Sequence, residues 1–223
     1  MKRGFKSIAL SMVGLLLSVT LLVAGTYALF SDSATMKTHL QAGTLDAQLL
    51  RKGYTTQSLD DKGYLQTDVH TDSPYLDVSN LPTNPSASNY VNVFGMDLDD
   101  KISPTAEMSA DMQIKNNGSV AFIYEIEILP VAGSGAELLE QLTLSVTVNG
   151  TTYQADAGEL TLKGTPDSDG KVSADWHVPA GQSKDFTVTV TFADQADNND
   201  AQGQTVVFDL TVKAVQATKG PSA

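Results

Sequence analysis

The chain has 223 residues, no cysteine, and 26 acidic against 14 basic side chains, which gives a formal net charge of −12. Without cysteine it can form no disulfide, thiolate zinc site, iron–sulfur cluster or cysteine nucleophile. The acidic balance argues against a nucleic-acid partner, because few side chains could neutralise a phosphate backbone. Hydrophobic residues make up 41% of the chain, which is enough for a packed core.

The N-terminus has the layout of a secretory signal peptide. Three basic residues among the first six precede Ser7–Ser31, a largely apolar stretch without a charged residue. We predict that residues 1–28 are removed by cleavage between Ala28 and Leu29. The alternative is an uncleaved membrane anchor, because roughly 20 apolar residues span a bilayer. Cleavage takes away three of the 14 basic residues and no acidic one, so the exported chain would carry −15.

Two segments of different character follow the leader. Residues 29–50 are expected to form an N-terminal arm and a first strand. Residues 51–102 are rich in Asp, Ser, Asn and Pro and lack sustained alternation, which predicts a loop-rich insertion. Residues 103–217 hold the main strands, and 218–223 are expected to be a flexible tail. Because the strands on both sides of the insertion need partners, we expect 29–217 to form one domain.

Period-two alternation dominates the rest of the chain and predicts β-strands. Each stretch has one apolar and one polar face, which is typical of antiparallel sheets with one side in the core. Two such sheets, stacked face to face, would bury the apolar sets. We therefore predict an all-β, antiparallel two-sheet sandwich with at most short helices, such as 136–141. The alternating stretches are 107–115, 122–128, 142–148, 186–192 and 206–214.

Candidate catalytic and metal-binding residues are few. His39, His70 and His177 are isolated in the sequence, and no His-Glu-x-x-His pair exists, so we interpret all three as surface histidines. The loop Asp194–Asp200 offers Asp194, Asp197 and Asp200 as oxygen ligands of the kind that calcium prefers. The alternative is a solvated acidic turn. No nucleophile motif is present, and we expect no enzyme.

Four short motifs carry a family resemblance. Gly25–Asp32 reads Gly-Thr-Tyr-Ala-Leu-Phe-Ser-Asp, and Gln41–Asp46 reads Gln-Ala-Gly-Thr-Leu-Asp. Met112–Ser119 ends in Lys-Asn-Asn-Gly-Ser, and Val178–Ser183 holds a Pro-x-Gly turn. Together they resemble the TasA/camelysin (CalY) family, whose leader is of the type cut by a SipW-like signal peptidase.

The resemblance implies a secreted protein with a jelly-roll-like β-sandwich that assembles into fibres of the biofilm matrix or lies on the cell surface. Camelysin members are described as cell-surface metallopeptidases, so a peptidase is an alternative, although the sequence has no zinc motif. A surface- or carbohydrate-binding sandwich is a third interpretation. Its aromatic residues would be Trp176 and the tyrosines of the 51–102 insertion.

Fibre assembly has a physical rationale in the segment after the cleavage site. A free sheet edge can pair with an extended peptide from another chain, and head-to-tail docking yields an open filament, a homopolymer. We expect the donated strand to be Leu29–Leu40, with apolar Leu29, Phe30, Ala34, Met36 and Leu40. The alternative is a strand that pairs within its own chain. Because copies at −15 repel, assembly should favour higher salt or lower pH.

Overall fold

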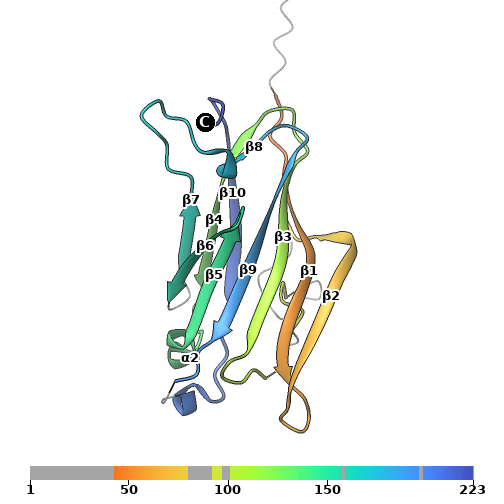
Figure 1. Ribbon diagram of the computed structural model, residues 1–223, viewed down its shortest axis with the longest axis vertical. Coiled ribbons are helices and arrows are strands. Elements are labelled where there is room, and N and C mark those ends of the chain that lie inside the picture. The colour runs from red at the N-terminus through yellow and green to blue at the C-terminus, as the bar shows by residue number, and fades with distance from the viewer. Residues whose placement is uncertain (1–42, 80–91, 97–100, 157–158, 196–197, 223) are drawn as a thin grey trace, which may run out of the picture. The chain divides into compact units, whose positions relative to one another are not determined.

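The computed structural model describes residues 43–79, 92–96, 101–156, 159–195 and 198–222, all within one compact unit, Gly43–Ala223 (Figure 1). Strands dominate this part of the chain. The strands are β1 (Ala47–Leu59), β2 (Leu65–Asp77), β3 (Glu107–Asn116), β4 (Phe122–Pro130), β5 (Leu142–Val148), β6 (Thr151–Asp156), β7 (Leu160–Lys163), β8 (His177–Val178), β9 (Ser183–Phe192) and β10 (Phe208–Gln216). The helical segments are α2 (Ala136–Glu140) and two 3₁₀ turns, η1 (Ala174–Trp176) and η2 (Asn198–Ala201).

The strands form two antiparallel sheets. The larger sheet has the order β2-β1-β3-β9-β5-β6, and the smaller has the order β10-β4-β7 with β8 beside β4. The β3–β4 turn and the segment with α2 each connect a strand of one sheet to a strand of the other. The predicted all-β, antiparallel two-sheet sandwich is confirmed.

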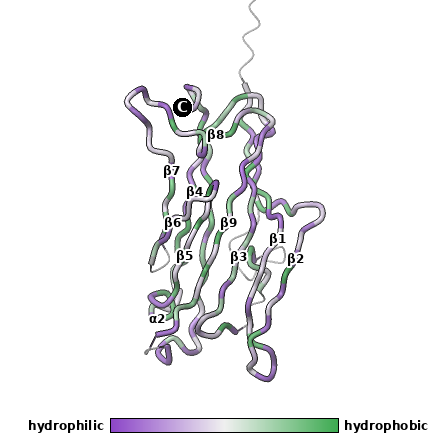
Figure 2. Tube along the Cα trace, viewed as in Figure 1, coloured by the Kyte–Doolittle hydropathy of each residue, from purple (hydrophilic) through white to green (hydrophobic). Residues whose placement is uncertain are grey.

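The core lies between the sheets and is built from the alternating stretches. Along the tube, hydrophobic and hydrophilic residues alternate on the central strands (Figure 2). On β3 every second residue from Met108 to Ile114 is at most 5% exposed, and the same alternation occurs on β4, β5 and β9. Because each strand offers one apolar face, the sequence pattern fixes which side faces the opposite sheet.

The last strand lies two residues further along the chain than its pattern predicted, at Phe208–Gln216. The expected short helix is also present, as α2. The apolar residues of β10 pack against the core but stay partly exposed, because β10 is at the edge of the smaller sheet.

The stretch 51–102 differs from the expected loop-rich insertion over its first half. Most of β1 and all of β2 lie in it and form a long antiparallel hairpin at one side of the larger sheet. Alternation is missing there for two reasons. β2 is exposed along most of its length, and the pairing shifts register between Arg51 and Gly53, which breaks the period of β1.

Candidate functional site

Several predicted site residues lie outside the described part of the chain. These are the cleavage pair Ala28 and Leu29, the donor residues Leu29, Phe30, Ala34, Met36 and Leu40, and also His39 and Asp197. The described residues do include the free strand edges of the sandwich, to which a donated strand could add.

Two members of the predicted calcium site, Asp194 and Asp200, lie in the described part of the chain. Asp194 and Asp200 are both exposed, the first before η2 and the second within it. Across residues 43–79, 92–96, 101–156, 159–195 and 198–222, no group of three or more His, Asp or Glu side chains could hold a metal ion.

The two described histidines differ from one another. His70 is a half-exposed residue of β2 whose ring stacks on Tyr54 at 5.1 Å between centroids, with Nε2 3.4 Å from Asp72 Oδ1. His177 is 7% exposed in β8, where it pairs with Ile123 of β4. The prediction of a surface histidine is wrong for His177, because β8 adds to the smaller sheet directly after the buried Trp176.

A buried ion pair joins the two strands of the hairpin. Arg51 of β1 donates from Nε to Asp72 Oδ2 at 2.7 Å and from Nη2 to Oδ1 at 3.1 Å, and both residues are buried. The remaining nitrogen, Nη1, donates to the carbonyl of Asn92 at 2.9 Å. The hydrogen bonds from Arg51 hold the pKa of Asp72 below its usual value of 3.8.

The same face of the hairpin holds the segment 92–96. The guanidinium of Arg51 lies 4.8 Å from the ring centroid of Tyr54, and Thr56 donates its hydroxyl to the carbonyl of Phe94. A Cβ on Gly95 would meet the Tyr54 ring at 2.0 Å, so a larger residue at position 95 would push the ring away. This half of the larger sheet is therefore covered by a peptide segment that polar groups fasten.

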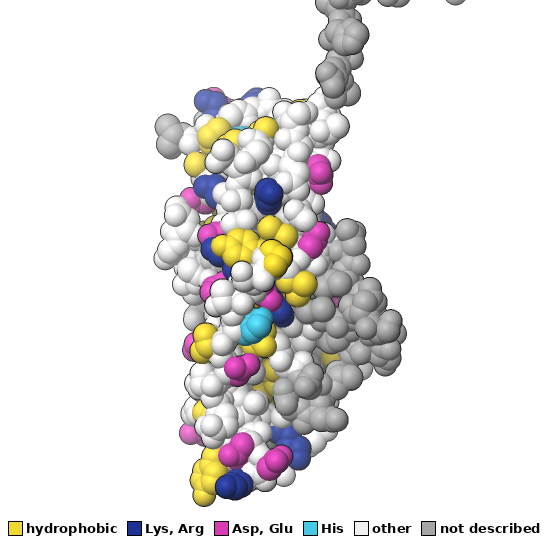
Figure 3. All heavy atoms as spheres, turned by 90° about the vertical axis from the view of Figure 1, so that its right-hand side faces the viewer, with side chains coloured by type: hydrophobic (Ala, Val, Ile, Leu, Met, Phe, Trp, Pro, Cys, Tyr) yellow, Lys and Arg dark blue, Asp and Glu magenta, His cyan; other side chains and the backbone are white. Residues whose placement is uncertain are grey.

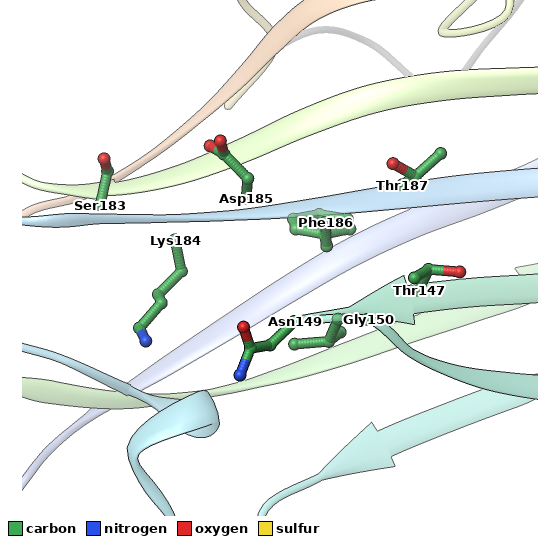
Figure 4. A pocket seen from close by; sticks show the side chains of 9 residues that line it. Thr147, Asn149, Gly150, Ser183, Lys184, Asp185, Phe186 and Thr187 are labelled. Carbon is green, nitrogen blue, oxygen red and sulfur yellow. The ribbon is translucent and has the colours of Figure 1, made fainter.

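A shallow pocket of about 360 Å³ lies where β5 ends and β9 begins. In Figure 4, Lys184 and Asn149 lie on one side of β9, whereas Ser183 and Asp185 lie on the other. Although burial alone would raise it, hydrogen bonds from Lys52 and Gln113, both at 2.8 Å, lower the pKa of Asp185. The lining residues include a lysine, amides and hydroxyls but no nucleophile with an adjacent base, so the pocket is better suited to binding than to catalysis.

The four outermost strands of the sheets have free edges of different quality. β7 has four residues and β6 has six, so each offers little length for pairing. β2 has 13 residues, but its register breaks opposite Lys52, and the same stretch contains Pro74. Proline, bulges and charged residues on an edge strand are devices that block pairing.

The free edge of β10 has neither a proline nor a bulge, and its charged residues are Asp209 and Lys213, the latter ion-paired with Glu127 of β4. All nine residues of β10 pair with β4 in one unbroken register, from Phe208 opposite Pro130 to Gln216 opposite Phe122. Its core-facing side chains pack against the core yet remain partly exposed. They are Phe208, Leu210, Val212 and Ala214. β10 is thus a long, regular edge with an apolar face that its own sheet leaves half covered.

The N-terminal end of the described chain is fastened to one end of the sandwich. The amide of Thr44 donates to Ser119 Oγ at 3.0 Å, and the amide of Ser119 donates to the Thr44 carbonyl at 2.9 Å. Beside them the fully buried Asn116 donates from Nδ2 to the carbonyls of Val120 and Val178 at 2.8 and 3.1 Å. The side chain of Asn116 thus joins the β3–β4 turn to β8.

Comparisons with known proteins give a family match in the N-terminal part of the chain. A family model described as "Camelysin metallo-endopeptidase" matches residues 4–52. No curated protein matches the chain. Among solved structures the chain is similar to AvmM, which catalyses macrocyclization in alchivemycin A biosynthesis. The identity is 17%, over 55% of this chain and 85% of that one, with a TM-score of 0.30.

In the described residues, no helix has the length and apolar character needed to cross a membrane. The matched residues 4–52 include the Gly25–Asp32 and Gln41–Asp46 motifs that first indicated a relationship. On this match the N-terminal part of the chain is similar to the camelysin family.

Proposed function

We propose that this chain is a secreted structural protein whose copies assemble head-to-tail into extracellular fibres. In this proposal the SipW-type cut between Ala28 and Leu29 frees the segment Leu29–Leu40, which then adds as a strand to the free edge of β10 in the next copy. The fibre contributes to a biofilm matrix or a cell-surface layer, where other matrix components are further partners.

The observation that carries the proposal is the free edge of β10. It offers nine residues in one register and an apolar face that is half covered. Strand addition supplies main-chain hydrogen bonds for affinity and side-chain packing on alternate residues for specificity. A donated strand would cover the exposed parts of Phe208, Leu210 and Val212, and each buried methylene contributes about 0.8 kcal/mol.

The proposed donor has the matching pattern. Between Leu29 and Leu40 the apolar residues Phe30, Ala34, Met36 and Leu40 occupy even positions, which they share with Asp32 and Thr38, while the odd positions after Leu29 are polar. In an extended strand the even positions share one face. The four apolar residues of that face can pack on the core side of β10, with the polar odd-numbered residues in water; Asp32 is the one charged residue on the packing face.

Substitutions on the two faces of the donor test the proposal. In the exported, processed chain, Phe30→Asp with Met36→Asp should abolish filaments seen by negative-stain electron microscopy, because two carboxylates would enter an apolar site. Ser31→Asp with Ser33→Asp adds the same charge on the opposite face and should leave filaments intact.

Deletion of Leu29–Leu40 gives a second arm of the same experiment. The circular dichroism spectrum and unfolding transition should be retained, because the described sandwich begins at Gly43, whereas filaments should be lost. Filaments that persist after the deletion contradict the proposal.

The family's description as a metallo-endopeptidase supplies an alternative function. A peptidase would hold stoichiometric zinc and cleave casein in a chelator-sensitive way. Both measurements on the processed chain separate this alternative from the structural protein proposed here.

A further inference from the structure

Charged side chains are distributed unequally between the two ends of the sandwich. One end, called the acidic end here, is where β10 begins and α2 packs beside η2. Four acidic side chains lie there, with no lysine among the described residues of α2, η2 and the first two residues of β10; Lys62 and Lys101 lie at the β1–β2 turn of the same end. The four acidic side chains are Glu137, Glu140, Asp200 and Asp209.

The opposite end, called the lysine end here, is where β3 ends and β9 begins. Lys115 of β3 and Lys184 of β9 lie there on adjacent strands, since Lys184 pairs with Ile114. Neither lysine has an ion-pair partner among the described residues. The loops at this end carry further lysines as well as aspartates, so the end is close to neutral, unlike the acidic end. These are Lys171, Lys219, Asp46, Asp167, Asp169 and Asp175.

The chain enters the sandwich at the lysine end. Thr44 is hydrogen bonded to Ser119, and the amide of Asn117, two residues after Lys115 of β3, donates to the Asp46 carbonyl at 2.8 Å. Only two residues separate Leu40 from Gly43. An extended chain advances at most about 3.6 Å per residue, so a donated strand that ends at Leu40 can reach no more than roughly 11 Å from Gly43 at the lysine end of its own copy.

Because this connection is short, the direction of the donated strand along β10 determines which end of the donating copy faces which end of the receiving copy. β10 runs from Phe208 at the acidic end to Gln216 at the lysine end. If the donor is antiparallel to β10, its Leu40 end lies beside Phe208, and the lysine end of the donating copy faces the acidic end of the receiving copy. If the donor is parallel, two lysine ends meet.

We propose that Leu29–Leu40 pairs antiparallel to β10, so that the lysine end of each copy docks against the acidic end of the next. This inference rests on the proposed function and adds the polarity of the contact. Two observations support it. Lys115 and Lys184 would face the carboxylates of Glu140 and Asp200 rather than other lysines, and every strand pair in both sheets is antiparallel, the more stable arrangement per residue.

The contact also changes the expectation from net charge. A uniform charge of −15 predicts repulsion between copies, whereas opposite local charges within one Debye length, about 8–10 Å, dominate at a contact. Complementary patches raise association rates and exclude wrong orientations. The ends therefore set the polarity of a chain whose total charge opposes association.

Charge reversal at each end, alone and together, tests the polarity. The first variant carries Lys115→Glu and Lys184→Glu, and the second carries Glu140→Lys and Asp200→Lys. These four side chains make no hydrogen bond or ion pair among the described residues, so the fold should be retained. Elongation of the exported, processed chain would be followed by light scattering and electron microscopy.

We expect each variant alone to elongate at least about tenfold more slowly than the parent chain, because like charges then face one another. An equal mixture of the two variants should elongate at close to the parent rate, as an alternating fibre. The fourfold variant, which has the parent's net charge, should do the same. Asp68→Lys on β2 serves as a control and should change the rate by less than about twofold.

The outcomes separate the two proposals. If reversal at either end leaves the rate within about twofold of the parent, or the mixture stays as slow as its components, the antiparallel end-to-end contact is wrong. Loss of fibres in the donor-face variant Phe30→Asp/Met36→Asp would then still support strand donation. If the parent chain forms no fibres at all, both proposals fail.

Discussion

The outermost strands β2 and β10 are both long, both antiparallel to their neighbour, and both free on one side, yet they differ in nearly every other respect. β2 turns a polar face toward the protein, where Asp72 pairs with Arg51, and its register breaks beside Pro74. β10 turns an apolar face toward the protein and keeps one register over nine residues. Of these two edges, only β10 combines an unbroken register with an apolar face that is incompletely covered. These are the features that leave a free edge open to the addition of another strand.

The outward face of β2 sharpens this contrast. Figure 3 shows hydrophobic side chains spread over the face that β2 presents, interrupted by charged ones. Val69 is 70% exposed and Tyr64 is 65% exposed. Val69 lies on β2 and Tyr64 directly precedes it, and the bulge and Pro74 limit strand pairing along this edge.

The largest expected effect comes from placing the same charge on each edge. Val212→Lys puts an ammonium on the half-covered face of β10 and should slow fibre elongation at least about tenfold, because an inward-facing lysine blocks strand addition. Val69→Lys on β2 should change elongation by less than about twofold. Light scattering on both purified variants checks the difference, and equal effects would show that β10 is not the edge in use.

The next effect concerns the polar face of β2. Arg51→Ala leaves Asp72 buried without its partner and frees the Asn92 carbonyl, and should lower the free energy of unfolding by about 3–5 kcal/mol. The paired replacement Arg51→Met with Asp72→Leu removes both charges and should cost clearly less. Urea unfolding of the three proteins measures this, and equal losses in both variants would mean that the ion pair is not what holds the hairpin.

A smaller effect should appear with pH. The folded-state pKa of Asp72 is depressed below 3.8, chiefly by the hydrogen bonds from Arg51. A carboxyl with a depressed pKa contributes stability that is present above its unfolded pKa and is lost as pH falls through the folded value. Between pH 5 and pH 3 the parent chain should therefore lose more stability than the Arg51→Met/Asp72→Leu variant. Thermal unfolding midpoints across that range test the sign, and parallel curves would contradict it.

The sequence predicted the central strands well because each of them satisfies a local rule. Every second residue from Met108 to Ile114 had to be apolar if that face was to meet the opposite sheet, and it is buried. The hairpin β1–β2 does not follow this rule, since its inner face is completed by Arg51, Asp72 and a peptide segment instead of an apolar layer. A polar interior at one side of a sheet has no periodic signature.

For the proposed fibre contact, the sequence indicates only the donor side. The alternation of Phe30, Ala34, Met36 and Leu40 is visible in the sequence, but the receiving edge depends on which strands end up outermost, and that order follows from pairing across more than 70 residues. The burial of His177 depends in the same way on a two-residue strand that no pattern marks. Non-local pairing, rather than local propensity, decides both.

The fastening of residues 44–46 to the β3–β4 turn has a mechanical consequence. A pull on the N-terminal arm would reach β1 along its own axis, after crossing the hydrogen bonds between Thr44 and Ser119 and between Asn117 and Asp46. The ladder from Ala47–Asn116 to Thr55–Ser109 lies across that direction, so its hydrogen bonds would share the load in shear instead of opening one after another. A fibre linked in this way would resist stretching through the same strands that shape each subunit.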